Sequence, residues 1–322
     1  MMVLIGLNLL ALLLLVAYVA RRAFPLTEAV RMRNALLLEA STDADFRWAP
    51  PAFPACYKVE RHPATSEFRA IVEAVAAQGD RSDWQRSLLL ARHLTECAAD
   101  KGPLQADLPT TYRGIRSGYG YCADFVKVYL ALAHAAGITA RQWAFSFDGF
   151  GGHGHTFVEI YDRQRQGWLC LDVHNNFHFV ERATGEPLDA LRMRQLMGDD
   201  SGKLDLAPNG PGRMVFRYPE KAVEYYRRGL SGWYMWWGNA VFTYYGHPAV
   251  LVAVRVSAWL AHLIAIVAGL QPRIRILCTP ENEVAVAMMF ALRRRLILIG
   301  STFALLVAAL VLQLALVRAH GH

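Results

Sequence analysis

Three residues of this 322-residue chain could together carry out nucleophilic chemistry. Cys122 precedes the stretch ADFVKVYLALAHAAG, His155 opens HTFVEIY, and Asp172 lies near the end of WLCLDV. A thiol becomes a good nucleophile as the thiolate, which a helix N-terminus and a neighbouring imidazolium both favour. A histidine can exchange protons with the substrate, and a carboxylate can orient that histidine through its second nitrogen. Cys122, His155 and Asp172 are therefore the candidate catalytic residues.

The elements that must position these side chains are readable in the local pattern. Apolar residues recur at helical spacing after Cys122, and Gly137 stands where a helix C-cap is expected, so Cys122 should begin a helix. Three β-rich runs follow, ITARQWAFSF, HTFVEIY and WLCLDV, separated by the loop DGFGGHG and the turn DRQRQG. The sequence thus predicts an α+β fold in which His155 and Asp172 lie on adjacent antiparallel strands.

Two more helices are predicted before the cysteine. Apolar residues between 68 and 75 recur at helical spacing, and Ser82 with Gln85 resembles a capping box before WQRSLLLARHLTEC. The segments GYGYCADFVKVYLALAHAAGITAR, GGHGHTFVEIYD and GWLCLDV then resemble the three signature blocks of the transglutaminase-like superfamily, over roughly residues 84 to 175.

This resemblance implies a papain-like fold in which Cys122 is the nucleophile, His155 the proton carrier and Asp172 the orienting acid. It implies amide cleavage, acyl transfer to amines or deamidation, each through a thioester. One departure is that the third block of the family usually continues with a proline after the aspartate, whereas Val173 and His174 follow Asp172 here.

The oxyanion of such a reaction needs hydrogen-bond donors. The backbone N–H of Cys122 is the natural first donor. The resemblance implies a second donor from an upstream side chain, for which Tyr112, Tyr119 and Tyr121 are candidates.

Four histidines allow a metal hypothesis, since an HxH pair on a strand with an aspartate nearby could bind zinc. They are His153, His155, His174 and His178. A metal would leave the helix that begins with Cys122 unexplained, so we favour the cysteine interpretation and expect neither metal nor cofactor. His153 is then a loop or substrate-side residue, because only His155 has the register of HTFVEIY.

Other candidate residues have simpler interpretations. Glu159 shares a strand face with His155, so it either supports the site or is a solvated carboxylate. Arg141 is expected to be an ion-paired strand residue more than a substrate contact, and Trp168 is expected in the core. The five cysteines of the chain are scattered and odd in number, which argues against a disulfide framework. The four besides Cys122 are expected to be inert: Cys56, Cys97, Cys170 and Cys278.

The composition favours a membrane-attached globular protein. The chain is 54% apolar and 19% charged with a net charge of +7, which excludes collagen-like, disordered and disulfide-rich classes. The apolar share is raised by runs at both ends, at 1–20 and 296–317. Each run is about 30 Å long as a helix, enough to span a bilayer. The positive balance needs no nucleic-acid partner.

Residues 1–20 are expected to span rather than to be a cleaved signal peptide, because no Lys or Arg precedes the apolar run. A third apolar segment, 249–270, contains Arg255 and His262 and is expected either to span or to lie in the membrane interface. The arginines that follow the first span and precede the last favour a cytoplasmic domain, with a periplasmic domain as the alternative if 249–270 spans.

The sequence is divided accordingly. It predicts a transmembrane helix (1–20), a juxtamembrane helix and linker (21–57), a catalytic domain (58–200), an aromatic-rich connecting segment (201–246), a spanning or interfacial helix (249–270) and a final transmembrane helix (296–317).

These features predict a bacterial inner-membrane cysteine enzyme that cleaves or transfers the acyl group of a peptide or protein substrate. Hydrolysis is favoured over cross-linking because water is always present. The competing hypothesis is a non-catalytic module that holds a peptide or a partner in a membrane envelope complex. The complete set of Cys122, His155 and Asp172 favours the enzyme.

Overall fold

The structure is a computed structural model that describes residues 2–23, 25–76, 81–97, 101–104, 106–212, 214–256 and 258–320. Its helices are α1 (Met2–Ala23), α2 (Leu26–Leu37), α3 (Ser66–Ala76), α4 (Asp83–Thr95), α5 (Leu108–Arg116), α6 (Cys122–Ala135), α7 (Ala190–Asp199), α8 (Pro219–Arg227), α9 (Val241–Tyr245), α10 (Pro248–Val256), α11 (Ala258–Val267) and α12 (Glu283–His320). Its strands are β1 (Leu38–Ser41), β2 (Ala140–Ser146), β3 (Gly154–Asp162), β4 (Gly167–Leu171), β5 (Phe177–Glu181), β6 (Leu204–Pro208), β7 (Trp233–Trp236) and β8 (Ile274–Leu277).

A six-stranded sheet with the order β1-β8-β7-β2-β3-β4 forms the centre of the domain. β1 and β8 are parallel, and the other neighbours are antiparallel. β5 and β6 form a separate two-stranded sheet. Three strands of the main sheet, β1, β7 and β8, lie outside residues 58–200. The folded domain therefore includes residues on both sides of the expected catalytic segment, 58–200.

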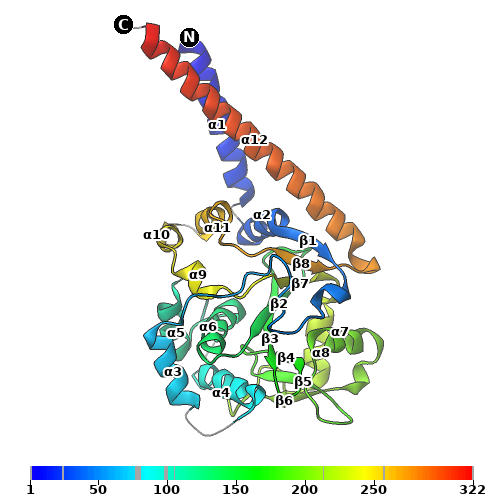
Figure 1. The fold of residues 1–322 in the computed structure, drawn as a ribbon. Coiled ribbons are helices and arrows are strands. Elements are labelled where there is room, and N and C mark those ends of the chain that lie inside the picture. Colours follow the sequence, from blue (N-terminus) through cyan, green and yellow to red (C-terminus); the bar gives the residue numbers. More distant parts are fainter. Residues whose placement is uncertain are drawn as a thin grey trace.

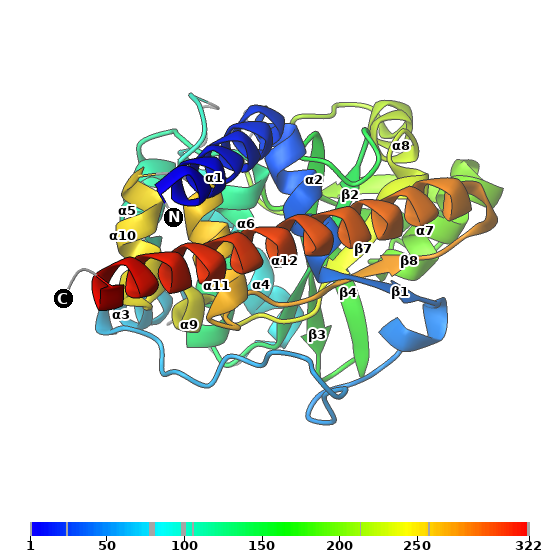
Figure 2. The same ribbon diagram turned by 90° about the horizontal axis from the view of Figure 1, so that it is seen from above.

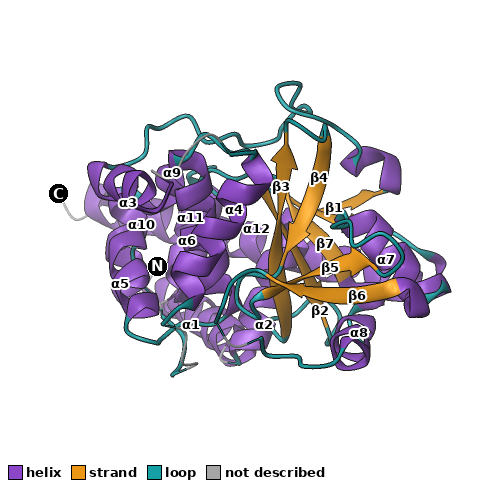
Figure 3. Ribbon diagram, turned by 90° about the horizontal axis from the view of Figure 1, so that it is seen from below, coloured by secondary structure: helices purple, strands orange, loops and turns teal. Residues whose placement is uncertain are grey.

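The main sheet lies between α3 to α6 on one side and α7 and α8 on the other (Figure 3). This follows from the strand register, because alternate side chains point to opposite faces. Val158 and Ile160 pack in the same core cluster as the apolar side chains of α6. Trp143 and Phe157, which are paired across β2 and β3, point to the opposite face and pack in the cluster that contains Tyr226 of α8.

The helix predicted to begin at Cys122 is confirmed and is the central helix of the domain. It ends as expected for a glycine C-cap: Gly137 has φ +68°, and the Ile138 N–H donates to the Ala133 carbonyl. The predicted helices over 68–75 and after Ser82 are confirmed as α3 and α4. The mixed α+β fold class is confirmed as well.

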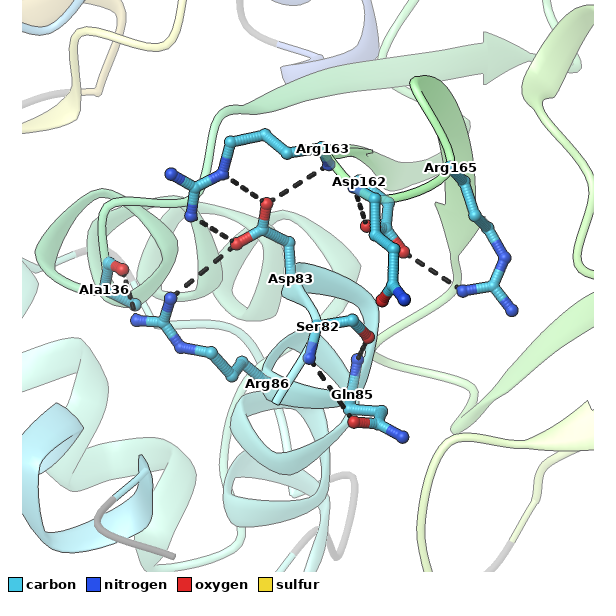
Figure 4. Close-up of polar contacts among 9 residues, drawn as sticks. Ser82, Asp83, Gln85, Arg86, Ala136, Asp162, Arg163 and Arg165 are labelled. Atoms are coloured by element: carbon cyan, nitrogen blue, oxygen red, sulfur yellow. Dashed lines mark hydrogen bonds and ion pairs between the residues drawn. The ribbon is translucent and has the colours of Figure 1, made fainter. Parts of the chain in front are cut away.

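The start of α4 is tied to the turn between β3 and β4 (Figure 4). Ser82 and Gln85 form the predicted capping box. Arg163 Nε and Nη2 both donate to the Asp83 carboxylate at 2.7 Å, and Arg86 donates to the Ala136 carbonyl at the end of α6. These bonds join α4, α6 and the strand that carries His155.

The two terminal helices leave the domain together on one side (Figure 1). α1 and α12 are both long and apolar enough to cross a membrane. They contact each other through Asn8, whose Nδ2 lies 3.1 Å from the Leu306 carbonyl and 3.3 Å from Gln313 Oε1. Seen from above, both helices lie over the domain (Figure 2).

α12 also forms part of the domain. Val286 and Met289 in its first turns are buried in the core cluster that includes Leu38 of β1 and Ile276 of β8. Arg293 Nη1 donates to the Leu38 carbonyl at 3.1 Å. One continuous helix thus links the main sheet to the apolar C-terminal segment.

The apolar segment 249–270 has a different shape from the single helix expected. It contains two short helices, α10 and α11, which pack against each other through Val250, Ala253, Ala261 and Ala265. Helices of 9 and 10 residues are about 14 to 15 Å long, roughly half the thickness of a hydrocarbon core. Neither helix is long enough to span a bilayer by itself.

Candidate active site

Cys122 is the first residue of α6 and is partly exposed. Asp124 shapes the approach to it: its carboxylate accepts the backbone N–H of Tyr121 at 3.1 Å and that of Leu104 at 2.9 Å. Gly120, with φ +110°, makes the turn into the helix in a conformation that other residues rarely adopt. The backbone N–H groups of a first helical turn have no partner within the helix, so this position suits an oxyanion.

His155 is buried on β3, and its Nε2 lies 2.7 Å from Asp172 Oδ2. Burial by itself would lower the pKa of His155, but the Asp172 carboxylate and a side-chain hydrogen bond with Cys122 raise it to about 10. The imidazole of His155 therefore has hydrogen-bond contacts with both the Asp172 carboxylate and the Cys122 side chain. The structure thus brings the three predicted residues together in the order sulfur, imidazole, carboxylate.

Asp172 follows β4 and is almost completely buried. Burial would raise the pKa of its carboxyl group, but His155, Tyr226 and Asn175 together hold that pKa below its ordinary value. Tyr226 Oη donates to Oδ2 at 2.7 Å, Asn175 Nδ2 donates to Oδ2 at 2.6 Å, and the Asn175 N–H donates to Oδ1 at 3.1 Å. A buried carboxylate stays charged only with donors of this kind.

After Asp172 the chain forms a turn at the place where the family usually has a proline. Asp172 and Phe177 form an isolated antiparallel bridge, and Asn176 adopts a left-handed conformation with φ +59° in the turn between them. Asn175 folds back from this turn onto the carboxylate. The residues after Asp172 therefore supply a hydrogen-bond donor.

Tyr226 and Asn175 were missed by the sequence analysis. Asn175 belongs to a run of Asn and His residues, and asparagine side chains often bond to nearby groups in turns. Tyr226 carries no such signal, because it lies on α8, 54 residues after Asp172, and only the tertiary structure brings it to the site.

Residues 69–173 match the model of the transglutaminase-like superfamily. The range contains Cys122 and His155 and ends one residue after Asp172. Comparison with curated proteins and with solved structures gives no match. The chain therefore contains a transglutaminase-like domain, to which its N- and C-terminal parts add strands and helices.

The glycine-rich loop before His155 is held by α2 in this transglutaminase-like domain. Asn34 Nδ2 donates to the Phe150 carbonyl at 2.8 Å, and Arg31 Nη2 donates to the Asp148 carbonyl at 2.6 Å. The Gly152 N–H donates to the Thr27 carbonyl at 3.2 Å. The helix that follows the apolar helix α1 in the chain thus contacts the loop that leads into the candidate general base.

The three tyrosines considered for the oxyanion lie elsewhere or point outward. Tyr112 Oη lies 2.8 Å from His93 Nε2, and Tyr119 packs under the Lys101 ammonium. The Tyr119 and Tyr121 side chains are 43% and 46% exposed. Within the described ranges, none of these three side chains forms a hydrogen bond with Cys122.

Arg141 and Glu159 form a buried ion pair away from the catalytic group. Arg141 Nε lies 2.7 Å from Glu159 Oε2, and the side chains are 2% and 0% exposed. Glu159 also accepts from Trp143 Nε1 and the Ala190 N–H. The ion-paired interpretation of Arg141 is confirmed. The expectation of a solvated carboxylate was wrong, because Glu159 is completely buried and neighbouring donors on the strand and on α7 satisfy it.

The histidines considered as metal ligands separate in space. His178 Nδ1 lies 3.0 Å from Asn209 Oδ1, whereas His153 packs its ring on Phe147. His174 lies beside the site, with its ring centroid 6.3 Å from that of His155. Within the described part of the chain, no group of three His, Cys, Asp or Glu side chains is arranged to hold a metal ion. Trp168 is 9% exposed, as expected for a core residue.

Proposed function

We propose that this chain is a membrane-anchored cysteine hydrolase or acyltransferase that acts on an amide or peptide bond through a thioester. The supporting observation is the array of Cys122, His155 and Asp172 inside the transglutaminase-like domain. The buried pair of His155 and Asp172 stabilises a protonated imidazole beside a nucleophile at a helix N-terminus.

In the proposed reaction, the Cys122 sulfur attacks the substrate carbonyl carbon, and the carbonyl oxygen becomes an oxyanion next to the first turn of α6. His155 then gives its proton to the leaving nitrogen, the C–N bond breaks, and a thioester forms with release of an amine. Water then attacks the thioester carbon while His155 accepts its proton, the C–S bond breaks, and a carboxylic acid leaves with the Cys122 thiolate and the protonated His155 restored. An acceptor amine in place of water would give a new amide instead.

Hydrolysis is the favoured outcome, and a peptide or protein is the proposed substrate. The lipid bilayer is the second proposed partner, because α1 and α12 are able to cross it. The chain is proposed to lie in the inner membrane of a bacterium. The non-catalytic alternative would use the same domain to hold a peptide or an envelope membrane protein.

The pH dependence of Cys122 alkylation tests the proposal in the full-length protein. Iodoacetamide labelling is followed peptide by peptide with mass spectrometry, so that the exposed Cys56 serves as an internal reference. Because the pKa of His155 is raised to about 10, the imidazole stays protonated below that pH. We expect Cys122 to react at pH 6 at least about tenfold faster than Cys56 and to lose this advantage in His155→Ala.

Equal labelling of Cys122 and Cys56 from pH 6 to 9, with no effect of His155→Ala, would exclude the activated nucleophile.

A second test distinguishes an enzyme from a non-catalytic binding module. Cys122→Ser keeps the shape of the domain, so a cell that depends on catalysis should lose function at normal protein level. Unchanged function in that cell would favour the module.

A further inference from the structure

A cavity of about 320 Å³ begins one residue from the nucleophile. Ala123, Lys127 and Leu130 line one wall and lie on one face of α6 at helical spacing. The opposite wall comes from α10 and α11, which lie on the side of the domain where α1 and α12 leave it (Figure 1). The cavity therefore lies between the start of the catalytic helix and the membrane-side hairpin.

Arg33 of α2 places a fixed positive charge at this cavity. Its Nε and Nη2 donate to Asn34 Oδ1 at 3.1 and 2.9 Å, and its guanidinium lies 4.7 Å from the centre of the Trp236 ring. No ion pair joins Arg33 to a carboxylate in the described ranges. A preorganised guanidinium without a carboxylate partner is suited to bind an anion.

A second polar group at the cavity also lacks a partner. Arg33 Nη1 lies 3.3 Å from His262 Nε2, and since arginine can only donate, Nε2 must accept. The neutral ring then carries its proton on Nδ1, which is buried and has no hydrogen-bond partner among the described residues. Gln271 Oε1, at the same cavity, is also buried and unpaired. Buried polar atoms without partners are uncommon, and an acceptor atom of a ligand would satisfy the His262 Nδ1–H, whereas Gln271 Oε1 is itself an acceptor and needs a donor.

The other residues that line the cavity restrict the chemical class of ligand that it can bind. The remaining walls include Trp236, Tyr244, Val241 and Val254 and are mainly aromatic or aliphatic. Lys127 is already paired with Asp124 at 3.3 Å, so Arg33 is the cation left for a ligand. A ligand that fits has an anionic end for Arg33 and His262 and an apolar body for the walls.

We propose that this cavity, whose lining includes Ala123 next to the nucleophile in the chain, binds a carboxylate or phosphate group carried on an apolar body. Resting on the proposed function, the ligand is the acyl part of the substrate, which would then bear an acidic group in addition to the carbonyl that Cys122 attacks. The same chemistry is present in the headgroup of an anionic membrane lipid, and the hairpin of α10 and α11 would give a lipid access.

Binding of hexanoate and of the neutral hexanamide to the full-length protein in a non-ionic detergent tests the proposal. Saturation-transfer NMR measures the two affinities. We expect hexanoate to bind at least about tenfold more tightly than hexanamide, and Arg33→Gln to remove this preference. Arg113→Gln is the matched control, because Arg113 is 62% exposed on α5 and does not line the cavity.

Two further variants guard against a folding defect. Arg33→Lys keeps the charge and should retain part of the preference for hexanoate. Val254→Trp fills the cavity while leaving Arg33 in place, and should weaken both ligands. Equal binding of hexanoate and hexanamide to the wild type, or a preference that survives Arg33→Gln, would overturn the proposal.

The source of the anion is found by competition. If nanodiscs of phosphatidylglycerol displace hexanoate and nanodiscs of phosphatidylcholine do not, the natural ligand is the headgroup of an anionic lipid. Hexanoate that stays bound in both identifies a soluble acidic substrate. Iodoacetamide labelling of Cys122 in the same samples keeps the two proposals apart. If Cys122 has the reactivity of an ordinary thiol but hexanoate still binds selectively, the proposed enzyme function is contradicted and the proposed binding site is not. If Cys122 is activated but hexanoate does not bind selectively, the binding site is contradicted and the enzyme function is not.

Discussion

At the scale of single residues, the Asp172 carboxylate is the charged group that orients His155 in the site. It is buried, and it is kept charged by donors from three different parts of the chain: His155, Asn175 and Tyr226. Burying a charge is costly unless it is hydrogen-bonded, so each donor contributes to the stability of the fold as well as to the orientation of His155.

Tyr226→Phe tests this view. The change removes one hydrogen bond to a buried charged group, and we expect the free energy of unfolding to fall by about 2 kcal/mol. Chemical denaturation of the detergent-solubilised protein measures it. Tyr218→Phe, at the exposed start of the same helix, is the control and should leave stability unchanged. Equal stability of Tyr226→Phe and the wild type would show that the hydrogen bond contributes nothing.

At the scale of secondary-structure elements, the candidate general base is held by contacts between elements that are distant in sequence. β3 carries His155, and the turn at its far end is joined to α4 by Asp83 and Arg163 (Figure 4). The loop at its near end is joined to α2 by Asn34. Both ends of the strand are thus anchored to helices.

Asp83→Asn should weaken the anchor at the turn. The hydrogen bonds and charge of Arg163 lower the pKa of the Asp83 carboxyl group, so this pair stabilises the fold above the ordinary pKa of 3.8 and the contribution is lost as the pH falls through the lowered value. We expect a loss of about 1 kcal/mol at pH 7, small because Arg163 is exposed to solvent. The difference between variant and wild type should disappear at low pH in a denaturation series.

A matched comparison uses Glu96→Gln at the end of the same helix, which removes the exposed ion pairs of Glu96 with Arg92 and Arg116. That variant should unfold like the wild type at every pH. A loss at pH 7 as large as that of Asp83→Asn would show that burial of Asp83 has no special effect.

At the scale of the whole molecule, both ends of the chain converge on one side of the domain. α1 and α12 leave together, and their far ends carry the two termini (Figure 1). Arg21 and Arg22 lie at the domain end of α1, and Arg293 to Arg295 lie near the domain end of the apolar part of α12. With two spans, both arginine clusters lie on the side of the domain, which favours a cytoplasmic domain with both termini outside.

Labelling with a membrane-impermeant maleimide tests this orientation. Cys56 reports on the domain, and an added cysteine in Ala319→Cys reports on the C-terminal end. In intact cells we expect only the second cysteine to be labelled, and after permeabilisation both. Labelling of Cys56 alone in intact cells would place the domain on the periplasmic side.

The sequence by itself determined the parts of this protein that depend on local physics. Helical spacing and the Gly137 cap define α6, alternation and turn residues define β2 to β4, and long apolar runs define the two terminal helices that are able to cross a membrane. Each pattern acts within one element, so Cys122, His155 and Asp172 could be assigned to their elements without the fold.

The tertiary structure alone decided which distant groups meet. It placed Tyr226 on Asp172, joined Arg141 to Glu159, added β1, β7 and β8 to the sheet, and divided 249–270 into two packed helices. It also placed Arg33 at a cavity beside the start of α6. Such contacts depend on how separate elements pack, and no local periodicity specifies the partner that a buried polar group will find.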